Sequence, residues 1–213
     1  MDVEAFLRDL PALFADFPRS DVPVDRSLQP VCEAVEGLSE ENNLALLRLA
    51  ARHLEPGECY LEAGTYRGRS LIGAALGTGA TCIGIDNFSF ADSDPEGLAH
   101  NIERFGVGDH VRVIHGDTVT ALREEAIPPV GVFFYDADHS TEATRAALEA
   151  VTGRLAEAAV IVVDDAEWEK VRAATDAFLA AHAGAELRLR IAGRAAGRPW
   201  WWDGMDVLSW TRA

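Results

Sequence analysis

The sequence predicts an α/β fold built on a doubly wound, mostly parallel sheet that ends in an antiparallel C-terminal hairpin. Beyond residue 57, short apolar runs typical of strands alternate five times with patterns typical of helices. The last two strand-like runs, in contrast, have no helical pattern between them. Five consecutive βα units imply a parallel sheet with helices on both faces, and right-handed crossovers make that sheet doubly wound.

The predicted elements follow an N-terminal segment that four prolines divide into short pieces. Apolar residues between Leu44 and Ala50 predict a helix that ends near His53, before a Pro-Gly turn. The closing strands are Leu187–Ile191 and Asp206–Trp210, joined by a link rich in Gly and Trp. Between these come strands at 58–63, 81–86, 110–115, 130–136 and 159–164, and helices at about 69–75, 95–105, 119–125, 141–155 and 168–181.

Composition and charge exclude several classes of protein. The chain has 213 residues, 48% of them hydrophobic, and a formal net charge of −16. This length is enough for one domain with a proper core, and such an acidic surface repels the phosphate backbone of nucleic acids. No apolar run reaches the length of a membrane span and no signal peptide is evident, so we expect a cytoplasmic protein. The three cysteines have no C-x-x-C spacing, and we interpret them as small buried thiols.

A glycine-containing loop follows the first predicted strand, with Gly64 and Gly68 at its ends. A dinucleotide site would need G-x-G-x-x-G, with small residues facing a pyrophosphate. Here Tyr66 occupies the middle position and Glu62 stands two residues before the first glycine. An acid at that place would repel a pyrophosphate and would suit a ligand with an ammonium group and a sulfonium centre.

Acids also follow the second and third strands. Asp86 lies about twenty residues beyond the glycines, where an acid hydrogen-bonds a ribose diol. Asp117 follows the third strand, where an adenine edge would lie. This pair of acids suits both NAD and S-adenosylmethionine. The choice between the two cofactors therefore depends on the loop from Gly64 to Gly68.

Carboxylates end the fourth and fifth strands as well. Asp136 and Asp138 follow one strand, and Asp164 and Asp165 follow the other. Since the carboxyl ends of neighbouring parallel strands line one crevice, these acids should crowd together. Two like charges 4 Å apart repel by about 4 kcal/mol at an effective dielectric of 20, so the cluster holds either protons or a cation such as Mg²⁺. The alternative is that Asp138 or Ser140, and Asp165, cap the following helices.

His139 lies three residues after Asp136. Beside the predicted carboxylate cluster, it becomes a candidate general base. The other five histidines have no such neighbours, and we interpret them as structural or surface residues: His53, His100, His110, His115 and His182.

These motifs resemble a known family. Residues 61–70 look like the cofactor loop of the catechol O-methyltransferase-like enzymes, and are closer still to the macrocin and mycinamicin O-methyltransferases. Residues 135–142 resemble their D-x-x-H or D-x-D-x segment, and Asp164-Asp165 resembles their D-D or D-N pair. The resemblance covers roughly residues 35–183. It implies the Rossmann-like fold of the class I S-adenosylmethionine-dependent methyltransferases.

The resemblance also implies roles for individual residues. Asp136, Asp164 and Asp165 would bind Mg²⁺, which lowers the pKa of the acceptor hydroxyl. His139 stands where the catechol enzymes have a lysine base, whereas Asp138 stands where some antibiotic sugar enzymes have an aspartate base, so both remain catalytic candidates. The implied cofactor-binding residues are Glu62, Gly64, Thr65, Tyr66, Gly68, Ser70, Asp86, Asp117 and Asp136.

The expected function is therefore O-methylation of a small molecule, such as a sugar or a natural-product scaffold, in natural-product biosynthesis. We expect residues 1–45 to form a helical cap that contacts the substrate and residues 46–213 to form the methyltransferase domain. Trp168 and the link at 198–202 would contribute to the acceptor pocket, with Trp200 to Trp202 serving either as an aromatic platform or as core or subunit contacts. The oligomeric state, including a homo-oligomer, stays open. The alternatives are a metal-dependent hydroxylase-like enzyme on the same fold, a nicotinamide oxidoreductase and a non-catalytic cofactor-binding protein.

Overall fold

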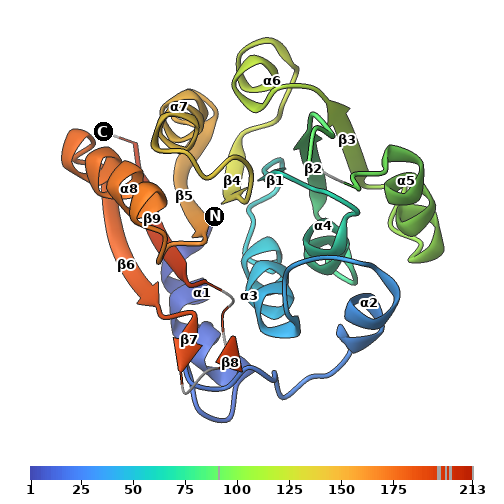
Figure 1. The fold of residues 1–213 in the computed structure, drawn as a ribbon. Coiled ribbons are helices and arrows are strands. Elements are labelled where there is room, and N and C mark those ends of the chain that lie inside the picture. The colour runs from blue at the N-terminus through green and yellow to red at the C-terminus, as the bar shows by residue number, and fades with distance from the viewer. Residues whose placement is uncertain (91, 196–197, 200, 202, 213) are drawn as a thin grey trace.

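The computed structural model describes residues 1–90, 92–195, 198–199, 201 and 203–212. Within these residues, one seven-stranded sheet has the strand order β3-β2-β1-β4-β5-β9-β6 (Figure 1). The first five strands of the chain run parallel to one another, and β9 is antiparallel to both β5 and β6. The strands are β1 (Cys59–Ala63), β2 (Thr81–Asp86), β3 (Val111–His115), β4 (Val130–Tyr135), β5 (Leu155–Asp164), β6 (Ala185–Ile191) and β9 (Met205–Thr211).

Helices cover both faces of the sheet, as the parallel order requires (Figure 1). The lower face in that view carries α3 (Glu41–Arg52) and α4 (Arg69–Ala75), with α5 (Pro95–Arg104) beside them, and the upper face carries α6 (Thr118–Glu124), α7 (Thr141–Val151) and α8 (Glu169–Ala181). The N-terminal segment forms α1 (Val3–Asp9), η1 (Leu10–Leu13) and α2 (Gln29–Ala34). Among the described residues, none of the helices combines the length and apolar composition that a bilayer span requires.

Alternation along the central strands builds a separate core on each face. In β4, Val132 and Phe134 join the cluster that contains α3 and α4. Their neighbours Phe133 and Tyr135 join the opposite cluster, with residues of α6, α7 and α8. Because successive side chains of a strand point to opposite faces, a strand buried on both sides is apolar throughout.

The predicted fold class is confirmed, including the antiparallel ending, with one correction to the end of a helix. The helix expected at 141–155 ends at Val151, because residues 152–154 form a turn and Leu155 already starts β5. The closing strands pair antiparallel at the edge of the sheet, as predicted, with β9 between β5 and the edge strand β6. The helix α3 runs across residue 45, where we expected the N-terminal cap to end.

Trp201 joins the two ends of the chain. The link before β9 contains a short ribbon of β7 (Arg194–Ala195) and β8 (Arg198–Pro199). Trp201 is fully buried, and its Nε1 donates a hydrogen bond to the carbonyl of Pro18 at 2.7 Å. Its ring lies edge-on to Phe14, with centroids 5.3 Å apart. This tryptophan therefore packs in the core, whereas Trp200 and Trp202 lie outside the described residues.

We expect Trp201→Ala to lower the free energy of unfolding by about 3 to 5 kcal/mol, because it empties a closed apolar site and removes a buried hydrogen bond. Urea denaturation measures the change. Trp168→Ala is the matched control, since Trp168 is 46% exposed and should cost much less. Equal losses for the two variants would contradict the anchoring role of Trp201.

Candidate active site

The site begins where the backbone leaves β1. Gly64 has a φ of +87°, a left-handed conformation that favours glycine, and a Cβ at this residue would overlap the backbone carbonyl of Asp136. The Gly64 N–H donates to the carbonyl of Ile85 at 2.9 Å, and the Asp136 N–H donates to that of Ala63 at 2.9 Å. The loop after β1 is thus fixed between the ends of β2 and β4.

Asp86, at the end of β2, holds this loop in place through hydrogen bonds to its backbone. Its Oδ2 accepts hydrogen bonds from the backbone N–H groups of Thr65 at 2.8 Å and Tyr66 at 2.7 Å. Its Oδ1 accepts one from the N–H of Phe88 at 2.6 Å. Tyr66 and Phe88 both have positive φ, at 49° and 52°. Strained backbone of this kind persists only where the surroundings enforce it, and it concentrates at functional sites.

A cavity of about 710 Å³ runs along the strand ends beside this loop, a volume within the usual range for small-molecule sites. Gly64, Thr65, Tyr66 and Ser70 line it near β1. The guanidinium of Arg69 donates hydrogen bonds to the backbone carbonyls of Val35, Ser39 and Cys32. The acidic, arginine and histidine side chains that line the cavity are Asp86, Asp117, Asp136, Asp138, Glu142, Arg69 and His139. This acidic lining suits a positively charged ligand and disfavours a pyrophosphate.

Glu62 lies behind the cavity wall, outside the residues that line it. Its carboxylate is fully buried and accepts hydrogen bonds from the hydroxyl groups of Tyr60 at 2.6 Å and Ser70 at 2.8 Å. Burial raises the pKa of Glu62 to about 8. Ser70 both lines the cavity and bonds Glu62, so Glu62 positions Ser70 from behind.

Two other predicted cofactor residues begin helices. Gly68, with a φ of +88°, precedes α4 and packs against Leu98 instead of lining the cavity. Asp117 lines the cavity and also caps α6, because its carboxylate accepts the N–H of Thr120 at 2.8 Å. This bond holds the pKa of Asp117 below its usual range.

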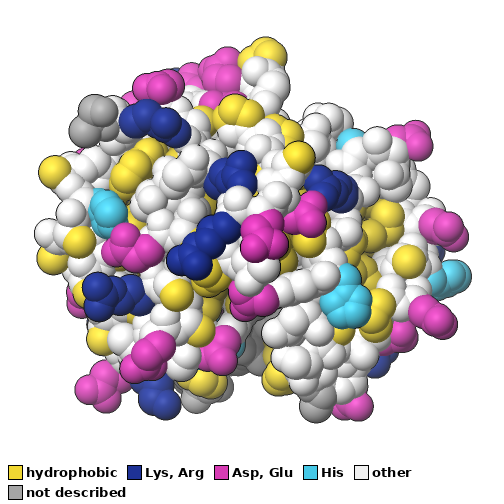
Figure 2. Space-filling model, turned by 90° about the horizontal axis from the view of Figure 1, so that it is seen from above, with side chains coloured by type: hydrophobic (Ala, Val, Ile, Leu, Met, Phe, Trp, Pro, Cys, Tyr) yellow, Lys and Arg dark blue, Asp and Glu magenta, His cyan; other side chains and the backbone are white. Residues whose placement is uncertain are grey.

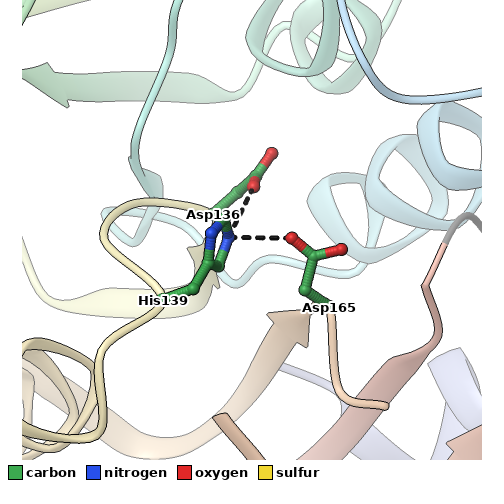
Figure 3. Close-up of side chains that lie close together, drawn as sticks. All are labelled: Asp136, His139 and Asp165. Atoms are coloured by element: carbon green, nitrogen blue, oxygen red, sulfur yellow. Dashed lines mark ion pairs between the residues drawn. The ribbon is translucent and has the colours of Figure 1, made fainter. Parts of the chain in front are cut away.

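A second cluster lies at the ends of β4 and β5 (Figure 3). His139 Nε2 forms ion pairs with Asp165 Oδ2 at 2.9 Å and with Asp136 Oδ1 at 3.7 Å. The carboxylates of Asp136 and Asp165 raise the pKa of His139 to about 10. One ligand atom from each of the three residues lies within 4.8 Å of the other two, close enough to share a metal ion.

The remaining two acids of the predicted set lie at the margin of this cluster. Asp164 is buried and contributes no atom to the group of three, and burial raises its pKa well above the usual range. Asp138 is exposed, and its Oδ1 accepts the N–H of Ser140 at 2.7 Å. The side chain and the backbone of Ser140 together lower the pKa of Asp138. The cap of α7 is Ser140, whereas Asp165 makes no capping bond to α8.

Apolar side chains surround the mouth of the site. Trp168 packs against His139, with ring centroids 5.0 Å apart, and its Nε1 donates to Asp203 Oδ2 at 3.0 Å. Leu38 and Phe90 line the cavity and are 56% and 63% exposed. The sequence indicated Trp168, but not Leu38 or Phe90, because both lie in loops without a periodic pattern. Exposed large apolar side chains beside a cavity are the signal that identifies them here.

Comparison with known proteins agrees with this geometry. Residues 61–166, about half of the chain, match the family described as a methyltransferase domain. Cofactor-bound Rv0187 from MTB is 25% identical, with a TM-score of 0.67, covering 99% of this chain and 96% of that one. An O-methyltransferase from Bacillus cereus in complex with SAH shares the fold at 19% identity, with a TM-score of 0.64, covering 90% of this chain and 93% of that one. So does the O-methyltransferase TomG from Streptomyces achromogenes, in complex with SAM, at 20% identity with a TM-score of 0.65, covering 100% of both chains.

No protein of curated function matches the chain. The family match and the shared fold nevertheless agree with the interpretation of the Gly64 loop and of the acids at the strand ends as a cofactor site. The chain belongs to the methyltransferase-domain family, and its sheet has the mostly parallel strands and the antiparallel ending that its sequence predicts for the class I methyltransferase fold.

The buried Glu62 should make the stability of the protein depend on pH. The unfolded chain releases this proton near the ordinary pKa of 4.5, whereas the folded protein holds it up to about 8. The contribution of Glu62 to the free energy of unfolding is thus complete below about pH 4.5. Above that pH it falls by on the order of 1 kcal/mol per pH unit until about pH 8. We expect the difference in free energy of unfolding between the native protein and Glu62→Gln to change steadily over this window in urea titrations. A constant difference would contradict the assignment.

Proposed function

We propose that the protein is an O-methyltransferase that transfers the methyl group of S-adenosylmethionine to a hydroxyl of a small molecule, with the help of a divalent cation. The proposal rests chiefly on the fact that the two parts of the site, the cavity and the carboxylate–histidine cluster, share one residue. Asp136 both lines the cavity beside the Gly64 loop and belongs to the cluster with His139 and Asp165. A methyl donor in the cavity would therefore end next to the group that activates the acceptor. Two proteins of this fold, from Bacillus cereus and Streptomyces achromogenes, are named O-methyltransferases.

The residues that line the cavity fit S-adenosylmethionine. The acidic lining suits the sulfonium and ammonium groups of this cofactor. A carboxylate has about four acceptor positions, and among the described residues Asp86 Oδ1 accepts one N–H, that of Phe88, so it retains capacity for a ribose hydroxyl. Asp117 and Val119 line the far end, where the adenine would lie, while Gly64 and Ser70 would contact the methionine part.

The second cluster fits a divalent cation. Asp164 Oδ1 and Asp165 Oδ1 are buried oxygens without a hydrogen-bond partner among the described residues. Such oxygens are costly unless a proton or a cation satisfies them. When bound, the cation would lower the pKa of the acceptor hydroxyl.

The protein's own residues would orient the acceptor and move its proton. Trp168, Leu38 and Phe90 supply an apolar rim against which a ring of the acceptor can pack. His139 or Asp138 would take the hydroxyl proton, and the acceptor oxygen would then attack the methyl group in line. Much of the rate enhancement would come from holding the two centres at near-attack distance.

The acceptor that we propose is a small, neutral molecule such as a sugar or a natural-product scaffold. Acidic side chains are spread over the face shown in Figure 2, intermixed with Lys and Arg. With a formal net charge of −16, such a protein repels a polyanion. The carboxylates of the site would likewise disfavour an anionic acceptor.

We expect Asp165→Asn to reduce methyl transfer by about 100-fold or more while leaving S-adenosylmethionine affinity within about threefold, since Asp165 belongs to the cation cluster and does not line the cavity. Transfer of a labelled methyl group to a panel of sugars and phenols measures the first quantity, and calorimetric titration the second. Asp109→Asn is the control, because Asp109 is an exposed acid that does not line the cavity. Full activity of Asp165→Asn in the presence of a chelator would refute the role of the cation.

We expect Asp86→Asn to weaken S-adenosylmethionine binding by about tenfold or more, because the amide loses one acceptor position for the loop and the ribose. The same titration measures the change. Unaltered affinity in this variant would mean that the cofactor does not contact the end of β2.

A further inference from the structure

We infer that His139 binds the divalent cation directly, as the third protein ligand beside Asp136 and Asp165, and that the site prefers a transition-metal ion such as Mn²⁺ to Mg²⁺. The inference rests on the proposed function, because it names the ligands of the cation proposed there. It also changes the expected ligand set, in which Asp164 was the third member and His139 a candidate base.

The distances within the cluster are those of ligands around one ion. Protein ligand atoms lie about 2.1 Å from such an ion, so neighbouring ligands at right angles are about 3 Å apart. His139 Nε2 lies 2.9 Å from Asp165 Oδ2 and 3.7 Å from Asp136 Oδ1. This nitrogen is buried and makes no hydrogen bond among the described residues, although both carboxylates face it (Figure 3). Asp164 contributes no atom to the same group.

The surroundings hold these side chains in place. Asp165 is more than nine-tenths buried, its Oδ2 faces His139, and its Oδ1 is without a partner among the described residues. Its backbone has a φ of 50°, a strained conformation for a residue other than glycine. The Trp168 ring also packs against the imidazole of His139, with ring centroids 5.0 Å apart.

The ligand types determine which ion fits. Carboxylate, carbonyl and water oxygens suit Mg²⁺, Ca²⁺ and Mn²⁺, whereas an imidazole nitrogen suits transition-metal ions such as Fe²⁺ and Zn²⁺. Two carboxylates and one imidazole therefore favour a transition-metal ion. With His139 bound to the ion, Asp138, which lines the cavity, is the remaining candidate for the base.

Pulsed electron paramagnetic resonance of the Mn²⁺-loaded full-length protein tests the ligand directly. We expect ¹⁴N modulation from a coordinated imidazole in the native protein and its loss in His139→Gln. His100→Gln, at an exposed histidine of α5, is the matched control and should keep the signal. Calorimetric titrations should show Mn²⁺ binding at least about tenfold tighter than Mg²⁺ in the native protein, with the two affinities within about threefold in His139→Gln.

S-adenosylmethionine affinity, measured on the same samples, separates this inference from the proposed function. If Mn²⁺ binds the native protein without nitrogen modulation, His139 is not a ligand and the inference is overturned, while the proposed function stands. The spectrum of the native protein decides this point even if His139→Gln fails to fold. If neither ion binds while methyl transfer proceeds with a chelator present, the role of the cation in the proposed function is refuted as well.

Discussion

The backbone of Gly64 lies directly against the carbonyl of Asp136, at the carboxyl ends of two adjacent strands. Only a residue without a Cβ permits this contact, and the left-handed φ of Gly64 turns the chain away from β1 at the same point. The loop that lines the cofactor cavity and the segment that carries Asp136 and His139 are therefore adjacent. This adjacency lets Asp136 both line the cavity and belong to the cluster with His139 and Asp165.

Backbone strain around the site follows from the same arrangement. The residues other than glycine with positive φ in the described chain are Tyr66, Phe88, Asp92 and Asp165. Tyr66 and Phe88 are held by the Asp86 carboxylate, which accepts both of their N–H groups. Such conformations cost about 1 to 3 kcal/mol each and require compensating bonds. The hydrogen bonds of Asp86 thus stabilise the loop before any ligand binds.

Charge explains why this α/β crevice suits a methyl donor better than a dinucleotide. Acids follow four of the parallel strands, and the charged side chains that line the cavity between them are mainly carboxylates. Arg69, the arginine of the lining, is bonded to backbone carbonyls and serves the fold of the N-terminal segment. The imidazole of His139 faces two of the carboxylates. A sulfonium cofactor and a divalent cation both match such a field, whereas a pyrophosphate would be repelled.

The alternation of strands and helices, the glycine loop and the acids at the strand ends could all be predicted from the sequence, because they depend on local periodicity and turn chemistry. The sequence could not determine which side each acid faces. Glu62 shares the face of Tyr60 and is bonded behind the cavity wall, and Asp164 shares the face of Val162. Asp165 reaches His139 from a left-handed turn. Leu38 and Phe90 line one cavity, and Trp168 packs against His139 of the same lining, because loops distant in the sequence fold together. No local pattern in the sequence records this tertiary packing.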